Sequence, residues 1–179
     1  MNYLNGLKTL IAVVIATLAF TSCSEEQTSL SIDDIPGKAK IIGSFTFNDG
    51  QRTSSSSTSN VDKPVANQTV YVKIQNASIS PNHTGNGYTT FETTTNANGE
   101  YEIEIPAVET GVTVIIQGAP FIGKKYSTSS SAITGGTTIT TKDGVYEATP
   151  ITLNSITPNE IIAAGKTIYG FTAFDSSAY

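Results

Sequence analysis

Apolar and polar residues alternate with a period of two at several places along the chain. In Glu100–Ile105 three carboxylates alternate with Tyr101, Ile103 and Ile105, and in Thr69–Ile74 every even-numbered residue is apolar. Successive side chains of a strand point to opposite faces of a sheet, so this pattern predicts strands with one buried and one exposed face. The same reasoning predicts further strands, in chain order, at 41–47, 88–95, 111–116, 145–153 and 166–174.

Turn-forming residues separate these predicted strands. Asn98-Gly99 predicts a tight hairpin between 88–95 and 100–105, because both residues tolerate a positive φ. Asp49-Gly50 and Asp143-Gly144 predict two further turns, and Pro158–Gly165 could form one short turn of helix that ends at Gly165. Two Ser-, Thr- or Gly-rich segments interrupt the pattern: 49–62, predicted as a mobile loop, and 127–141, a loop or an edge strand with polar faces.

The composition agrees with an all-β protein. Charged residues make up 14% of the chain, Trp is absent, and β-branched residues and turn formers are abundant. A single cysteine excludes an intramolecular disulfide, so the fold depends on its apolar core. Acidic residues outnumber basic ones, 15 to 10, which gives nucleic acid no basic surface to bind.

The N-terminus has the pattern of an export signal. Leu10–Phe20 is apolar except for Thr17; a run of about 11 residues suits the core of a signal peptide and is shorter than a membrane span. Ser22-Cys23 at its end resembles the lipobox of bacterial lipoproteins, although Phe20 stands where Leu is commonest. The resemblance implies a signal peptide at 1–22, palmitate-type acylation of Cys23 and attachment to a membrane through lipid. The alternative is ordinary cleavage near Ser22, which would leave a free thiol.

The residues after the cysteine bear on location. Ser24, Glu25 and Glu26 resemble the export signal that sends lipoproteins of Bacteroidetes-type bacteria to the outer face of the outer membrane; a solvated acidic linker is the alternative, and the periplasmic face stays possible. Residues 23–37 are expected to be a lipid-anchored, disordered tether. Residues 38–179 are then expected to be the folded β-sandwich domain.

A family resemblance covers roughly residues 38–126. Its elements are Lys40–Gly43 at the first strand, Lys63–Val70 leading into the second, and a turn motif formed by Thr95, Asn96, Asn98, Gly99 and Tyr101. This resembles the carboxypeptidase regulatory-like domain of the transthyretin-like (prealbumin-like) group. The resemblance implies a single antiparallel, Ig-like or transthyretin-like β-sandwich of about seven strands, which is usually an accessory, spacing or adhesive module. Strands within 127–179 are placed on composition alone.

No residue pattern indicates catalysis, and we expect no catalytic residue, no metal site and no cofactor. His83, the one histidine, is predicted to lie in a loop, and no Gly-x-Ser-x-Gly elbow accompanies it. A calcium loop starting at Thr94 would lack its acidic ligands, and the carboxylates Glu100, Glu102 and Glu104 are predicted to be solvated on one face of a strand.

The expected function is therefore non-enzymatic: a structural, adhesive or complex-assembly module of the cell envelope with a protein or glycan partner. A glycan-binding accessory lipoprotein of a polysaccharide-uptake system is one alternative. Its aromatic candidates, more often core residues in a sandwich, are Tyr71, Tyr88, Phe121, Tyr126, Tyr146 and Tyr169. A pilus-type subunit is the other alternative, with the sole arginine, Arg52, as a weak candidate for processing.

Overall fold

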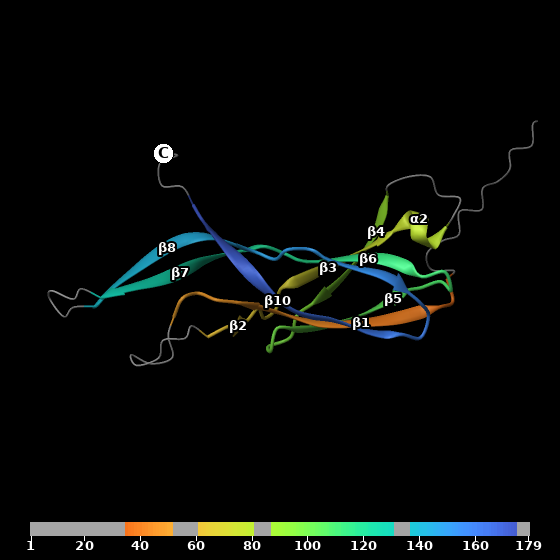
Figure 1. The fold of residues 1–179 in the computed structure, drawn as a ribbon, viewed down its shortest axis with the longest axis horizontal. Helices are drawn as coiled ribbons and strands as arrows, with labels where there is room; N and C mark the ends of the chain where they lie inside the picture. The colour runs from red at the N-terminus through yellow and green to blue at the C-terminus, as the bar shows by residue number, and fades with distance from the viewer. Residues whose placement is uncertain (1–34, 52–60, 81–86, 131–136, 175–179) are drawn as a thin grey trace, which may run out of the picture. The chain divides into compact units, whose positions relative to one another are not determined.

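The computed structural model describes residues 35–51, 61–80, 87–130 and 137–174 (Figure 1). Within these ranges the chain forms ten strands and one four-residue helical turn, α2 (Asn76–Ile79). The strands form two sheets around a shared apolar core, so the predicted all-β sandwich is confirmed. The described part has ten strands where about seven were expected. Of the three additional strands, one has two residues, one lies at 121–130, and one arises because the predicted strand 145–153 is divided between two strands.

The larger sheet contains six strands. Its order is β2 (Lys63–Pro64), β1 (Lys38–Phe47), β10 (Ile161–Ala173), β8 (Thr137–Glu147) and β7 (Phe121–Ser130), and β5 (Glu100–Pro106) also pairs with β1. β1 and β10 lie side by side and parallel, although they are far apart in sequence (Figure 1). The other strand pairs are antiparallel, so the sheet is mixed at this one contact.

The smaller sheet contains four antiparallel strands. Their order is β4 (Tyr88–Thr94), β3 (Thr69–Gln75), β6 (Val112–Gly118) and β9 (Ile151–Ile156). Its inner face is formed by alternate β-branched residues of β3 and β6, which are fully buried. The predicted alternation of β3 is thereby confirmed, since Tyr71 and Lys73 lie on the opposite, partly exposed face.

A cluster of aromatic rings lines the inner face of the larger sheet, with members from five of its strands. Phe45 stacks on Tyr101 with ring centroids 5.1 Å apart and meets Tyr169 edge-on at 5.5 Å. Tyr146 stacks on Phe121 at 5.0 Å, and both rings also contact Phe47. Such pairs add to the free energy that burial of their apolar area contributes. The core therefore extends from the middle of β1 to the ends of β7 and β8.

The turn after β4 does not form the predicted hairpin. The expected tight turn is present: Asn96 Oδ1 accepts hydrogen bonds from the N–H groups of Asn98 and Glu100, and Gly99 has a φ of 75°. However, β4 belongs to the smaller sheet and β5 to the larger one. The turn therefore leads the chain from one sheet of the sandwich to the other, and β4 and β5 pack against the core from opposite sides.

Two other turn predictions are wrong. Asp143-Gly144 lies inside β8, where Gly144 pairs with Gly123 of β7. Residues 158–165 form no helix in the structure, because β10 already begins at Ile161. Gly165 instead sits at a register shift between β1 and β10, with a φ of 80°. The predicted strand 145–153 is divided between the end of β8 and the start of β9.

Several predicted features lie outside the described residues. They are Cys23, Ser24, Glu25 and Glu26 of the predicted anchor, most of the predicted loop 49–62 including Arg52, and His83. At the start of the described part Ile35 is buried, and the carbonyl of Gly37 accepts a hydrogen bond from Ala107 N. The sandwich thus includes the last residues of the segment expected to be a tether. Among the described residues no helix is long and apolar enough to cross a membrane.

Candidate ligand-binding hollow at the base of a β-ribbon

Strands β7 and β8 continue together beyond the sheets as a two-stranded extension (Figure 1). β8 pairs with β10 at residues 144–147, and the carbonyl of Asp143 accepts one further bond from Phe174 N; residues 137–142 pair with β7 alone. We call residues 124–130 and 137–143 the ribbon. The alternative of an edge strand with polar faces is thus correct for the described residues of 127–141, since serine and threonine dominate both faces of the ribbon.

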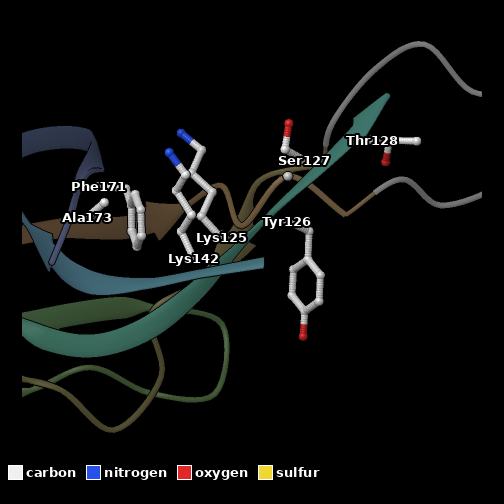
Figure 2. Close-up of a pocket in the computed structure, with 8 residues that line it drawn as sticks. Lys125, Tyr126, Ser127, Thr128, Lys142, Phe171 and Ala173 are labelled. Atoms are coloured by element: carbon white, nitrogen blue, oxygen red, sulfur yellow. The ribbon is translucent and has the colours of Figure 1, made fainter. Parts of the chain in front are cut away.

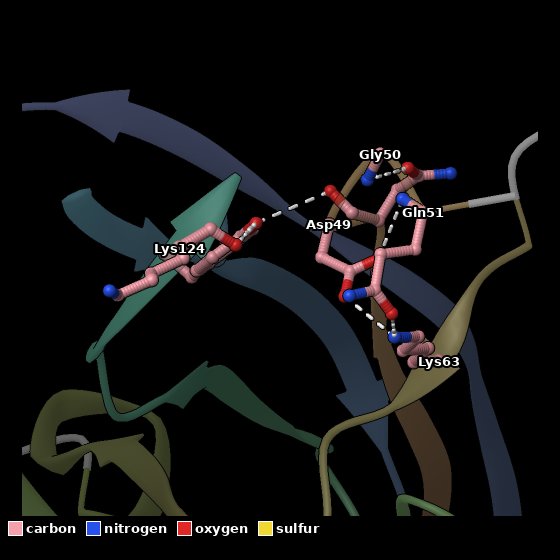
Figure 3. A network of polar contacts seen from close by, with 7 residues as sticks. Asp49, Gly50, Gln51, Lys63 and Lys124 are labelled. Carbon is pink, nitrogen blue, oxygen red and sulfur yellow. Dashed lines mark hydrogen bonds and ion pairs between the residues drawn. The ribbon is translucent and has the colours of Figure 1, made fainter. Parts of the chain in front are cut away.

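A polar network fixes the base of the ribbon to the end of β1 (Figure 3). Asp49 is 7% exposed; its carboxylate accepts from Lys63 Nζ at 2.6 Å and from Gln51 N at 3.0 Å. Its main-chain carbonyl accepts from Tyr126 N at 2.6 Å. A buried carboxylate needs such partners to offset its loss of solvation. The network therefore holds the turn 48–51 and the ribbon in one arrangement.

Beside this network lies a hollow of about 520 Å³ (Figure 2). Side chains from the ribbon line one part of it, and Phe171 and Ala173 of β10 line another. The full set of lining residues is Gly50, Lys125, Tyr126, Ser127, Thr128, Lys142, Phe171 and Ala173. The volume falls within the usual range for small-molecule sites, about 300–1,000 Å³.

Two lysines stand next to each other in this hollow. Lys125 and Lys142 are directly opposed in the register of β7 and β8, so their side chains lie on the same face of the ribbon, as Figure 2 shows. Neither forms an ion pair within the described ranges, whereas Lys124 on the other face lies 3.9 Å from Asp143. Lys125 Nζ is 5.6 Å from the ring centroid of Phe171, in a cation–π arrangement.

Hydroxyl groups continue this face toward the tip of the ribbon. Beyond the lysine pair, Ser127 faces Thr140 and Ser129 faces Thr138. All four residues are exposed. The face therefore presents two positive charges followed by four hydroxyl groups.

The residues that line the hollow offer charged and hydroxyl groups that can bind a ligand. A general acid–base pair or an activated nucleophile needs titratable groups within hydrogen-bond reach of each other, and the residues lining the hollow contain no carboxylate or imidazole. Within the described part of the chain, no three His, Cys, Asp or Glu side chains cluster as metal ligands.

The turn motif found in the sequence serves the fold. Thr95 is buried, and its hydroxyl donates to the carbonyl of Val65 at 2.6 Å while accepting from Gln68 N at 2.9 Å. Gly99 lies so close to the main chain of Phe45 that a side chain would collide with it. Tyr101 is buried in the core against Phe45. These residues thus join the segment 65–68, which leads into β3, to the turn and to β1.

The three acidic residues of β5 are exposed, as predicted. Glu102 pairs with Lys40 at 2.6 Å on the outer face of the larger sheet, and this contact raises the pKa of Lys40 through a hydrogen bond and Coulombic attraction. A second hollow, of about 630 Å³, is lined in part by Glu100, Glu102 and Gly43. Its carboxylates are wet, so they lack the burial that a catalytic carboxyl pair requires.

The six aromatic candidates for sugar binding fall into two groups. Tyr146 and Tyr169 are buried, and Phe121 packs against Tyr146. Burial also raises the pKa of Tyr101 and of Tyr169 to about 12. The remaining three are partly or largely exposed: Tyr71 and Tyr88 on the smaller sheet, and Tyr126 at the hollow. The buried ones are therefore excluded as sugar platforms.

Of the residues that line the hollow, Tyr126 was named from the sequence as a candidate for sugar binding, whereas Lys125, Lys142 and Phe171 were missed. Lys142 follows Lys125 by 17 positions, and Phe171 follows Lys142 by 29. The three residues come together through the pairing of β7 with β8 and of β8 with β10. The sequence signal that could have found Lys125 is the pair Lys124-Lys125 in an otherwise weakly charged segment.

No protein-family model matches this chain, and no significant match was found among curated proteins.

Proposed function

We propose that this chain is a non-enzymatic, lipid-anchored binding protein of the bacterial cell envelope, and that the ribbon is the element that contacts its partner. The observation that carries the proposal is the ribbon itself. Two strands extend beyond the sandwich with both faces largely exposed, and the buried Asp49 carboxylate, paired with the partly exposed Lys63, fixes their base. The role is structural, adhesive or complex-assembling.

The energetics of the ribbon support a role outside the core. An isolated pair of strands is at best marginally stable in water, because it has no apolar face to bury. Ile139 of the ribbon is 66% exposed, Ile122 just before the ribbon is 74% exposed, and the other side chains of the ribbon are mostly polar. The ribbon therefore adds little to the stability of the sandwich, and a partner that covers it would bury exposed apolar area.

The lipid anchor supports placement at a membrane. Acylation of Cys23 would hold the protein firmly, since each buried methylene of an acyl chain contributes ~0.8 kcal/mol and several chains act together. The sequence Ser24-Glu25-Glu26 favours the outer membrane with the domain facing the cell exterior. Residues up to 34 then connect the anchor to the sandwich.

The test is to shorten the ribbon. Lys124 and Asp143 are directly opposed, so residues 125–142 can be replaced by Asn-Gly, which forms a two-residue hairpin turn. We expect this variant to remain membrane-bound and folded but to lose surface adhesion or cross-linking to its envelope partner. The proposal fails if the shortened variant retains both. Cys23→Ser is the matched control for location, and we expect it to release an otherwise intact protein from the membrane.

Glycan binding is a second candidate, favoured by the hollow. Its hydroxyl-bearing lining and its open access suit a polymer of sugars more than a compact apolar ligand. Direct binding of polysaccharides to the protein and to the ribbon-shortened variant separates this candidate from contact with a protein.

A further inference from the structure

The geometry of the hollow points to an acidic sugar unit of an anionic polysaccharide as its ligand, with the acid group held between Lys125 and Lys142. This inference rests on the proposed function, in which the ribbon is the binding element. It adds the chemical class of the ligand and the residues that recognise it.

The first argument is the charge of the lysine pair. Like charges directly opposite each other in antiparallel strands destabilise the pair, and Lys125 and Lys142 have no carboxylate partner within the described residues. The chain as a whole is acidic, with a net charge of −5. A local concentration of positive charge on an acidic protein is suited to an anion, which would bridge both ammonium groups and remove their repulsion.

The second argument is the position of Phe171. Its ring packs against Tyr146 at 4.9 Å between centroids and lies beneath Lys125 Nζ at 5.6 Å. This contact restricts a flexible side chain whose ammonium group would otherwise sample many positions. Phe171 is thus a positioning residue for Lys125. Its ring face is engaged with the ammonium group, so the ligand is held by charge more than by stacking on an aromatic ring.

The third argument is the row of hydroxyl groups beyond the lysines. From Lys125 to Ser129 the ribbon rises by ~13 Å, which gives space for more than one sugar unit. Ser127, Ser129 and Thr138 present donors and acceptors along this distance, and Thr140, whose hydroxyl donates to the carbonyl of Ser127 at 3.3 Å, adds an acceptor. A polyhydroxylated chain can pair with such a row. An acidic peptide would bring apolar side chains to a face that lacks the exposed isoleucines Ile122 and Ile139, which lie on the opposite face.

The experiment measures polymer binding to the purified full chain in mild detergent, by biolayer interferometry at low and at high salt. The probes are polygalacturonate, which carries carboxylates, and dextran sulfate, which carries sulfates. Neutral dextran and poly-glutamate are the negative controls. We expect one or both of the acidic polysaccharides to bind, and the binding to weaken as salt rises. The polymer that binds with the higher affinity shows whether the site prefers a carboxylate or a sulfate.

Matched substitutions locate the site. Lys125→Gln and Lys142→Gln should each weaken binding about tenfold, and Phe171→Leu should weaken it less. Lys124→Gln removes the same charge one residue away on the opposite face, and it should change affinity by less than about twofold. Lys142→Glu creates a cross-strand ion pair with Lys125, so it should abolish binding while the melting temperature stays the same or rises.

The inference is overturned if Lys124→Gln weakens binding as much as the two hollow variants do. It is also overturned if dextran or poly-glutamate binds as well as the acidic polysaccharides, or if no polymer binds. If no polymer binds but the ribbon-shortened variant still loses its cellular interaction, the acidic-polysaccharide ligand is wrong and the proposed function stands. The failure of this inference and the failure of the proposed function can therefore be told apart.

Discussion

The main-chain N–H of Tyr126 donates a 2.6 Å hydrogen bond to the main-chain carbonyl of Asp49, and this contact joins the ribbon to the turn that follows β1. The side chain of the same aspartate is held by Lys63, 2.6 Å away. In addition, the hydroxyl of Tyr146 donates to the carbonyl of Lys124 at 3.2 Å. Three contacts between distant parts of the sequence therefore fix the base of the ribbon.

The Asp49–Lys63 pair should contribute measurably to stability. The Asp49 side chain is 10% exposed, so its hydrogen bonds are weakly screened by water. We expect Asp49→Asn to lower the free energy of unfolding by about 1–2 kcal/mol in urea denaturation, because the amide keeps the bond to Gln51 N but loses the charged one.

Asp143→Asn is the control for this prediction. Asp143 faces Lys124 at 3.9 Å, and both side chains are more than half exposed. The free energy of unfolding should change by less than about 0.5 kcal/mol. Equal losses for the two variants would show that the burial of Asp49 does not strengthen its ion pair.

The sequence predicts correctly which residues of a strand face the core where one face of the strand is buried and the other is exposed to solvent. In β5 the carboxylates Glu100, Glu102 and Glu104 are exposed, while Tyr101, Ile103 and Ile105 are buried. Local alternation suffices here, because each side chain responds only to its own face of the sheet. The sandwich class follows from several such strands.

Glycines mark the places where the sequence was misleading. Asp143-Gly144 is a residue pair typical of turns, yet both residues lie inside β8. Glycine is needed at position 144 because a side chain there would collide with the carbonyl of Thr172 and the ring of Phe171. Gly165 is the type of residue that commonly ends a helix, yet here it adopts a positive φ at the register shift between β10 and β1. Both requirements come from neighbouring strands, which local composition does not record.

The candidate site depends on register, so the sequence alone could not predict it. Lys125 faces Lys142 because β7 and β8 pair with one particular alignment, and a shift by one residue would place Lys125 opposite Asp143 or Thr141. The segment is polar on both faces, so no apolar alternation fixed this alignment in advance. The lysine pair became visible only from the pairing in the structure.

Gly99 and Gly165 offer a comparison of strain with crowding. Both have a positive φ, 75° and 80°, but a Cβ on Gly99 would collide with the main chain of Phe45, whereas a Cβ on Gly165 would meet nothing within 4 Å. We expect Gly165→Ala to cost about 1 kcal/mol from backbone strain alone. Gly99→Ala should cost about 3 kcal/mol or more, because the strain and the collision add. Urea denaturation of the two variants measures both effects, and similar losses would mean that the turn shifts freely.

Tyr101 and Tyr169 test what a buried hydroxyl contributes. Each residue is 3% exposed, and Tyr169 Oη donates to the carbonyl of Ala119 at 3.0 Å. The hydroxyl of Tyr101 has no hydrogen-bond partner among the described residues. Tyr169→Phe should therefore lower the free energy of unfolding by about 1 kcal/mol, while Tyr101→Phe should leave it unchanged or raise it slightly. A larger loss for Tyr101→Phe would indicate that its hydroxyl is hydrogen-bonded, for example by buried water.

The same two tyrosines should make the protein unstable in alkali. Burial raises the pKa of each hydroxyl to about 12 in the folded state, against about 10 in an unfolded chain. Below pH ~10 both states hold these protons, so this contribution to stability is fully present. Between pH ~10 and ~12 the unfolded chain loses protons that the folded chain keeps, and the free energy of unfolding falls as pH rises.

At its steepest, this fall should approach about 1.4 kcal/mol per pH unit for each tyrosine. Urea denaturation at several pH values from 9 to 11.5 measures the slope, and absorbance near 295 nm follows ionisation of the phenols directly. The double variant Tyr101→Phe/Tyr169→Phe removes both groups while keeping their rings, so its stability should decline less steeply with pH. Tyr88→Phe is the matched control, because it removes a phenol that is 46% exposed and lies outside the core. If the double variant and the control have the same slope, alkaline unfolding depends on groups other than these core tyrosines.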